Sequence, residues 1–280
     1  MTKWNLIIDI EKCGDCNNCF LACKDEHVDN DWPGYTESQP RHGHRWINIL
    51  RKERGQFPLI DVAYRPTPCI HCDNAPCIAA AETQAIYKRD DGIVLIDPQK
   101  AKGQKKLVNS CPYGAIWWNE EKKAPQKCTL CAHLLDTGWK QPRCVQVCPT
   151  GALKIIKIDD RKMQKRVENQ DLKILFPDHQ THPRVYYKNL HRFESCFIAG
   201  SVSVKLGDMI DCVQGAKVVL KKNDVVVAEM LTDNYGDYKL DYIKPDSGVY
   251  RLDVTYKDFE IKTITIEVTK SMSLKDIVFE

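Results

Sequence analysis

The sequence of 280 residues has no apolar run long enough to cross a membrane. Its longest weakly polar stretch, residues 197–204, is far shorter than the roughly 20 residues that a membrane-spanning helix needs. The first residues form neither a basic, apolar and cleavage-site series nor a twin-arginine motif. We therefore expect a protein of the cytoplasm, or one held peripherally at the membrane by a partner, without a transmembrane segment.

The sequence also lacks the usual marks of nucleic-acid binding and of independent catalysis. The net charge is only +3, with both signs interspersed, so no basic surface for nucleic acid is predicted. There is no nucleophile motif, no phosphate-binding loop and no nicotinamide fingerprint. The expectation is a chain with no catalytic residues of its own.

Cysteine, by contrast, is abundant: there are fourteen, of which twelve lie between Cys13 and Cys148. A disulfide framework fits poorly, because no secretory signal is seen and a chain of this size needs no such cross-links. Cysteines two residues apart are badly placed to bridge each other and well placed to converge on a metal. Cys196 and Cys212 lie outside the runs, and we expect both to be ordinary buried thiols.

The first and last cysteine runs predict two iron–sulfur clusters that exchange ligands. Cys13-x2-Cys16-x2-Cys19-x3-Cys23 has the bacterial ferredoxin spacing, in which three cysteines bind one cluster and the fourth reaches another. The last run, Cys128-x2-Cys131-x12-Cys144-x3-Cys148-Pro149, repeats this logic. The predicted sites are site A (Cys13, Cys16, Cys19, Cys148) and site B (Cys128, Cys131, Cys144, Cys23). Since Cys19 and Cys23 share one short segment, sites A and B should be neighbours.

The middle run predicts a third cluster and one absent cluster. Cys69-x2-Cys72-x4-Cys77 joins Cys111-Pro112, the end of another ferredoxin run, to form site C (Cys69, Cys72, Cys77, Cys111). The four positions where a fourth cluster would be ligated hold Ala81, Ala101, Gln104 and Leu107. Because every loss falls on a single cluster, the sequence predicts three whole [4Fe–4S] clusters in a chain, with site C beyond the other two.

Residues near these ligands have more modest expected roles. His71 and His133 are expected to make hydrogen bonds beside the clusters. Lys127 and Arg143 directly precede ligands and should offset cluster charge, and Trp117 and Trp118 should shield site C from water. His179 and His182 should be solvated loop residues. The alternative from another class is a zinc-stabilised scaffold, although zinc sites favour two Cys-x2-Cys pairs rather than triplets with a distant fourth ligand.

The chain is expected to divide at about residue 198. Residues 1–198 should form an α+β, loop-rich ferredoxin-like domain with strands over residues 5–10, 45–50, 85–88, 93–96, 115–118 and 153–158 and a helix over residues 161–169. In residues 199–280 apolar and polar side chains alternate, as at Tyr250, Leu252 and Val254, and turn sequences recur at short spacing. This pattern predicts an all-β sandwich, and its sequence resembles immunoglobulin-like modules of the transthyretin or Cna-B type.

The cysteine runs resemble those of the iron–sulfur subunits of the DMSO reductase family of molybdenum and tungsten enzymes. The match includes Arg65-Pro-Thr-Pro-Cys69-Ile-His-Cys72 and Lys127-Cys-Thr-Leu-Cys-Ala-His. The absent cluster and the β-module are similar to the branch that includes pyrogallol–phloroglucinol transhydroxylase and resorcinol hydroxylase, as are Trp32-Pro-Gly-Tyr and His42-Gly-His-Arg-Trp.

This resemblance implies a large catalytic partner subunit, in a heterodimer or larger complex. The partner would carry bis-molybdopterin guanine dinucleotide with molybdenum or tungsten and would bind the phenol. The present chain would carry electrons between that metal centre and an acceptor. The alternative within electron transfer is the ferredoxin subunit of a formate, nitrate or sulfur-compound oxidoreductase.

Overall fold

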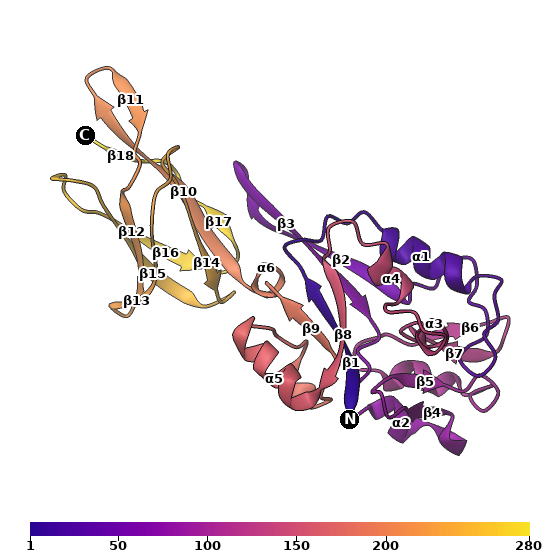
Figure 1. The fold of residues 1–280 in the computed structure, drawn as a ribbon. Coiled ribbons are helices and arrows are strands. Elements are labelled where there is room, and N and C mark those ends of the chain that lie inside the picture. The colour runs from indigo at the N-terminus through magenta and orange to yellow at the C-terminus, as the bar shows by residue number, and fades with distance from the viewer. The chain divides into compact units, whose positions relative to one another are not determined.

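The apolar run Leu6-Ile7-Ile8 becomes the buried centre of a three-stranded sheet. A computed structural model describes all residues 1–280, and in it β1 (Thr2–Asp9) lies between β8 (Leu153–Asp159) and β9 (Val185–Lys188) (Figure 1). β1 is antiparallel to β8, with Leu6 opposite Ile155, and parallel to β9, with Leu6 opposite Val185. Leu6 and Ile8 face one side of the sheet and Ile7 the other, where it packs with Met163 and Leu172, and all three are buried. Because both faces of β1 are covered, its sequence is an unbroken apolar run.

The sheet continues into α5 (Asp160–Asn169), which begins one residue earlier than the sequence predicts. The Asp159 carboxylate caps this helix by accepting a hydrogen bond from the Lys162 backbone N–H at 2.9 Å. Met163, the buried residue of α5, packs with Ile7 and Leu172. A charged helix is thus held by an apolar face and, at its first residue, by ion pairs of Asp160 with Lys3 at 3.0 Å and with Arg184 at 2.6 Å.

The rest of this part of the chain consists of short helices and two-stranded ladders. The remaining helices are α1 (Asn18–His27), α2 (Pro76–Ala80), α3 (Ala132–Asp136), α4 (Arg143–Gln146) and α6 (His191–Glu194), with 3-10 turns η1 (Glu82–Gln84), η2 (Lys105–Ser110) and η3 (Pro177–His179). The ladders are β2 (Ile47–Gln56) with β3 (Leu59–Pro68), β4 (Ile86–Lys88) with β5 (Val94–Ile96), and β6 (Trp117–Asn119) with β7 (Ala124–Gln126). Each predicted strand is present with shifted ends. No helix in the structure is long and apolar enough to span a membrane.

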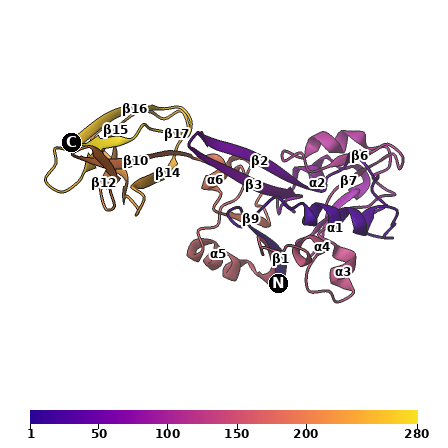
Figure 2. The ribbon, with the colours of Figure 1, turned by 90° about the horizontal axis from the view of Figure 1, so that it is seen from above.

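The chain divides into two compact units that differ in part from the expected domains. Unit 1 comprises Met1–Leu50 and Tyr64–Leu190, and unit 2 comprises Arg51–Ala63 and His191–Glu280. The β2–β3 ribbon (Figure 2) therefore contributes its tip, which the sequence analysis did not single out, to unit 2. The expected boundary between residues 198 and 199 stays a prediction, and β10 (Cys196–Leu206) runs across it.

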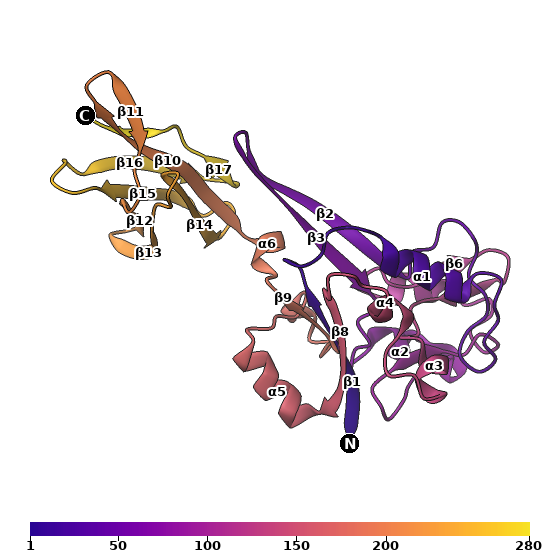
Figure 3. The same ribbon diagram turned by 45° about the horizontal axis from the view of Figure 1, so that its top comes forward.

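Unit 2 contains two sheets in which most strand pairs are antiparallel (Figure 3). Buried residues from both sheets form one apolar core. One sheet has the order β11 (Met209–Cys212), β10, β14 (Asp237–Ile243), with β17 (Met272–Ser273) and β18 (Ile277–Phe279) also paired to β10. The other has the order β13 (Val225–Leu231), β12 (Lys217–Lys222), β15 (Gly248–Thr255), β16 (Lys262–Val268). The expected alternation is confirmed on β15, where Tyr250, Leu252 and Val254 are buried in the shared core.

Candidate metal centres

The three Cys-x2-Cys loops share an unusual backbone. Residues with left-handed φ lie in or beside each loop: Asp15 at 54° in the first, His71 at 49° in the second and Leu130 at 54° in the third. Alternation of right- and left-handed residues turns successive N–H groups toward the same concavity, a geometry found at phosphate and iron–sulfur sites. The Leu130 N–H accordingly donates to Cys128 Sγ at 3.3 Å, and the Ala115 N–H to Cys111 Sγ at 3.4 Å.

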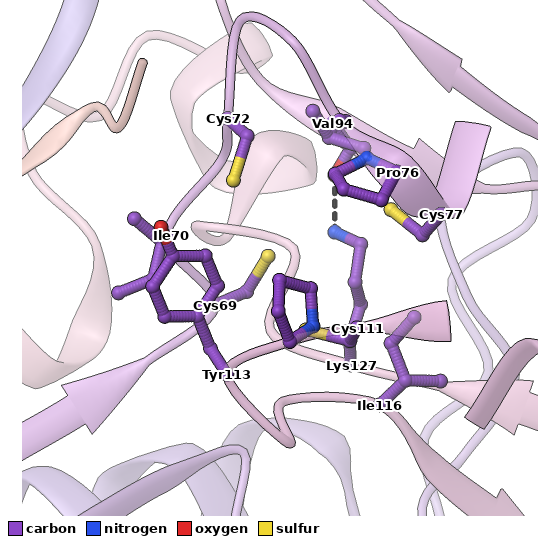
Figure 4. Close-up of a pocket in the computed structure, with 12 residues that line it drawn as sticks. Cys69, Ile70, Cys72, Pro76, Cys77, Val94, Cys111, Tyr113, Ile116 and Lys127 are labelled. Atoms are coloured by element: carbon purple, nitrogen blue, oxygen red, sulfur yellow. Dashed lines mark hydrogen bonds between the residues drawn. The ribbon is translucent and has the colours of Figure 1, made fainter. Parts of the chain in front are cut away.

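The four cysteines of site C lie around one cavity. Cys69, Cys72, Cys77 and Cys111 line it together with apolar residues, as Figure 4 shows. The apolar lining is Ile70, Ala75, Pro76, Val94, Pro112, Tyr113 and Ile116, and the one charged residue is Lys127. Burial and then the neighbouring Cys69 raise the pKa of the Cys72 thiol to about 12, so these sulfurs need positive partners to become thiolates.

The four cysteines of site B line a second cavity. Cys23, which lies on α1, joins Cys128, Cys131 and Cys144. Burial raises the pKa of the Cys144 thiol well above its usual range, with Cys131 as the next cause. The structure thus brings together residues that are more than a hundred positions apart in the sequence.

The cysteines of site A are grouped at a more exposed place. Cys19 is buried at the start of α1, Cys16 is exposed, and Cys13 and Cys148 are half-buried. Burial raises the pKa of the Cys19 thiol to about 12, and its three further electrostatic causes among the cysteines are Cys13, Cys148 and Cys16. The first run and the last cysteine therefore occupy one neighbourhood.

The three groups of cysteines form a series with site B in the middle. Cys19 of site A is close enough to Cys144 of site B to raise its pKa, after burial and the cysteines of site B itself. On the other side, burial and then Cys69 of site C raise the pKa of Cys128 in site B to about 11. The expected neighbourhood of A and B, with C beyond, matches this placement of the thiols.

Three of the four positions that the sequence analysis assigns to an absent cluster make ordinary protein contacts. Ala101 and Leu107 are fully buried, and Leu107 lies in η2, which packs against α2. The Gln104 side chain accepts from the Glu82 N–H at 3.1 Å and donates to the Lys100 carbonyl at 2.8 Å. This region is closed by apolar side chains and amide hydrogen bonds in place of sulfur.

Two histidines that the sequence analysis placed beside the ligands are buried and make hydrogen bonds. His71 Nδ1 accepts from the Val94 N–H at 3.1 Å, which leaves the ring proton on Nε2. His133 Nε2 lies 2.9 Å from Glu26 Oε1, and its ring stacks on Trp32. Burial lowers the pKa of His71 well below its usual range, with Lys127 the next cause, so this ring is neutral.

Two expectations about other residues are wrong. Trp117 and Trp118 do not line the site C cavity. The Trp117 ring lies beside His44 and the Trp118 ring beside Lys105, whereas Ile116 lines the cavity. Cys212 is exposed, because β11 is an edge strand with no buried residue, whereas Cys196 is buried as expected. His179 and His182 are both exposed, as the sequence predicts, although His179 ends the 3-10 turn η3 and only His182 lies in a loop.

Three residues that the sequence analysis missed line the site B cavity: His27, Trp46 and Thr129. His27 Nδ1, Trp46 Nε1 and Thr129 Oγ1 are buried without a hydrogen-bond partner in the protein. Buried polar atoms are rarely left unpaired, and sulfur atoms of a cluster would accept from such donors. The position of His27, four residues after Cys23 on one helix face, could have indicated this role.

The donor sets of all three sites fit a [4Fe–4S] cluster. Each site offers four thiols, and at sites B and C the walls are largely apolar and N–H groups donate to sulfur. A cluster bound there supplies one-electron exchange without rearrangement of the ligands. The ligand roles of these cysteines stay predictions.

Comparison with known proteins gives a consistent result. Residues 60–158 match the family model described as a 4Fe-4S dicluster domain. The chain is 49% identical, over 91% of its length and 91% of the relative, to the pyrogallol hydroxytransferase small subunit of Pelobacter acidigallici. The chain belongs to the iron–sulfur subunits of the DMSO reductase family. Membership of this family excludes the zinc-stabilised scaffold.

Two further members of the family cover less of the chain. The iron–sulfur subunit described for a dimethyl sulfoxide reductase of Halobacterium salinarum is 32% identical over 68% of this chain and 80% of the relative. The arsenate respiratory reductase iron–sulfur subunit of a Shewanella strain is 30% identical over 66% of this chain and 95% of the relative. Of these three relatives, the hydroxytransferase subunit matches the largest share of the chain.

Proposed function

We propose that this chain carries three [4Fe–4S] clusters, at sites A, B and C, and passes electrons for a molybdopterin enzyme that acts on phenolic aromatics. The observation that carries the proposal is the gathering of twelve cysteines into three neighbouring groups of four. One-electron exchange along such a series needs no residue to move, because a cluster gains or loses an electron without rearrangement of its ligands.

The phenolic substrate class rests on likeness to the hydroxytransferase subunit. The identity of 49% extends over 91% of this chain, whereas the relatives named for other substrates share 30–32% over about two thirds of it. The partner would be a large subunit with bis-molybdopterin guanine dinucleotide and molybdenum or tungsten, in a heterodimer or larger complex. In this proposal the large subunit transforms the phenol by hydroxylation or hydroxyl transfer, and the present chain holds no catalytic residue.

Unit 2 would be an immunoglobulin-like sandwich of the transthyretin or Cna-B type that serves as an interface or spacer. Its support is the pair of sheets around one core and the absence of any predicted cluster ligand, since its two cysteines, Cys196 and Cys212, belong to none of the sites. The complex is proposed to work in the cytoplasm, or peripherally at the membrane.

The test is purification of the native complex. We expect about twelve irons per chain, four for each of three clusters, with matching acid-labile sulfide and low-temperature EPR signals on reduction. We also expect activity with pyrogallol or resorcinol. Activity with formate, nitrate or a sulfur compound, and none with phenols, would overturn the substrate class, whereas an iron-free complex would overturn the cluster assignment.

A further inference from the structure

Lys127 is a buried cation inside the site C cavity. Its side chain lines that cavity beside the four cysteines, and the residue is only 3% exposed. Figure 4 shows its amine among the cysteine side chains, pointing to the Val94 carbonyl. Lys127 directly precedes Cys128 of site B in the sequence, whereas its side chain lines the cavity of site C.

The amine is held in place by backbone oxygens and not by a carboxylate. Lys127 Nζ donates to the Val94 carbonyl at 2.5 Å and to the Cys128 carbonyl at 3.1 Å. An ammonium has three N–H donors, so one remains for the cavity. The nearby Lys88 differs, because its amine pairs with Asp73 at 2.8 Å. Lys127 is therefore a lysine whose charge is balanced by no acidic side chain.

A buried charge without a counter-charge is strongly unfavourable. The groups that can balance Lys127 are the thiolates in its own cavity and the one that follows it in the chain. A cluster held by four thiolates is an anion, and reduction makes it one charge more negative. A fixed positive charge beside it favours the reduced form, since burial weakens the screening by water.

We propose that Lys127 is the shared counter-charge of the clusters at sites B and C, and that it raises the reduction potential of both, most strongly at site C. This inference rests on the proposed function, because it presupposes that both sites hold clusters. Lys127 is a positioning and tuning residue, since it acts on the potentials and binds no substrate. One electron passes between the two sites, so that one cluster is oxidised as the other is reduced, and no bond or proton changes.

The position of the amine supports this assignment. Lys127 lines the site C cavity together with all four cysteines of that site. Its amine also donates at 3.1 Å to the carbonyl of Cys128, a cysteine of site B. The same amine therefore lies beside the predicted ligands of two sites.

The experiment is an EPR-monitored redox titration of the purified complex with Lys127→Met and Lys127→Arg. The site C signal is the one lost in Cys111→Ala. For Lys127→Met we expect at least a tenfold fall in the equilibrium constant for reduction at site C, which is 59 mV for one electron. The shift at site B should be smaller, and site A should not change. Lys127→Arg keeps the charge and should restore site C to within threefold of the wild type.

Lys88→Met is the matched control, because it removes a lysine beside the same loop whose charge is already paired with Asp73. Its effect at site C should be less than threefold. An unchanged potential in Lys127→Met, or an equal fall in Lys127→Arg, would overturn the proposal. Lys127→Met could lose the site C iron altogether. In that case, retention of the iron in Lys127→Arg supports a required positive charge. Loss of the iron in Lys127→Arg as well shows that Lys127 acts by packing and overturns the proposal. Iron and EPR signals of the wild type separately test the proposed function.

Discussion

At the scale of single residues, the cysteine loops contain residues with a left-handed backbone conformation, which residues other than glycine rarely adopt. Leu130 and Cys131 both have left-handed φ, at 54° and 48°, which costs free energy for residues with a Cβ. This conformation directs backbone N–H groups at sulfur, as in the hydrogen bond from the Leu130 N–H to Cys128 Sγ. In the proposed wiring each loop depends on a distant one, since Cys23 on α1 lines a cavity with Cys144 on α4.

The proposed wiring predicts which cluster each cysteine variant loses. Cys111→Ala should remove only the site C cluster, and Cys23→Ala only the site B cluster, because each change deletes one corner ligand. Iron analysis should show about four of about twelve irons lost per variant, and EPR should show one signal lost. Cys212→Ala is the control, since its thiol is exposed on β11, and it should keep all iron. Loss of two clusters from either single change, with the fold intact, would contradict the pairing.

At the scale of elements, the β2–β3 ribbon is fastened by a buried ion network within unit 2. Arg54 on β2 has a side chain that is 1% exposed and contacts Asp61 at 2.5 Å and Asp241 on β14 at 2.9 Å. Asp61 also forms an ion pair with Lys239 at 3.1 Å. Burial alone would raise the pKa of the Asp61 carboxyl, but its hydrogen-bonding partners, first Arg192 and then Arg54, lower it well below its usual range.

Replacing Arg54 should therefore destabilise unit 2. Arg54→Ala removes the most buried cation from Asp61 and Asp241 and leaves them only the more exposed Arg192 and Lys239. We expect the free energy of unfolding to fall by about 3 kcal/mol at neutral pH. Urea unfolding followed by circular dichroism measures this change. Because the pKa of Asp61 is depressed in the folded state, the wild-type stabilisation is present above the unfolded pKa of about 3.9 and is lost as the pH falls below it. The difference between wild type and variant should shrink in that window.

Lys217→Ala provides the comparison for this prediction. Lys217 pairs with Glu229 at 3.0 Å, and both side chains are about half exposed. An exposed pair of this kind contributes about 0–1 kcal/mol. Equal losses of stability from Arg54→Ala and Lys217→Ala would show that burial of the Arg54 network adds nothing.

At the scale of the whole molecule, the two units have different sources of stability. The core of unit 2 is built from aliphatic and aromatic residues such as Ile198, Leu252 and Phe279, with none of the twelve run cysteines. In unit 1 the cysteines themselves line the interior cavities. Metal binding is linked to folding where the ligands converge only in the folded state, so unit 1 should depend on its clusters and unit 2 should not.

Removal of iron should therefore unfold the two units unequally. After anaerobic chelation, hydrogen exchange followed by mass spectrometry should show loss of protection at α1 and at β4–β5. Residues 191–280 should keep the protection they have in the untreated protein. Equal loss of protection in both units would mean that unit 2 has no stability of its own.

Much of the site could be predicted because cysteine spacing is a local property. Three cysteines two residues apart can reach one cluster whatever the rest of the chain does, and the fourth, followed by proline, is recognisable at Cys111 and Cys148. The strands of unit 2 were predictable for a similar reason, since alternation at Tyr250, Leu252 and Val254 reports one buried face. The assignment of the β2–β3 tip to unit 2 could not be predicted from the sequence. It depends on the ion pair between Arg54 and Asp241, two residues that are remote in sequence.

The sequence by itself determined the cysteine runs, the positions without a ligand at Ala101 and Leu107, and the strand periodicity, because each depends on neighbours along the chain. Only the tertiary structure decided the series of sites and the surroundings of each sulfur. It placed the Lys127 amine in the site C cavity, although Lys127 directly precedes Cys128 of site B, and it placed His27 and Trp46 at site B. The physical reason is that burial and charge at a sulfur are set by segments that meet through space.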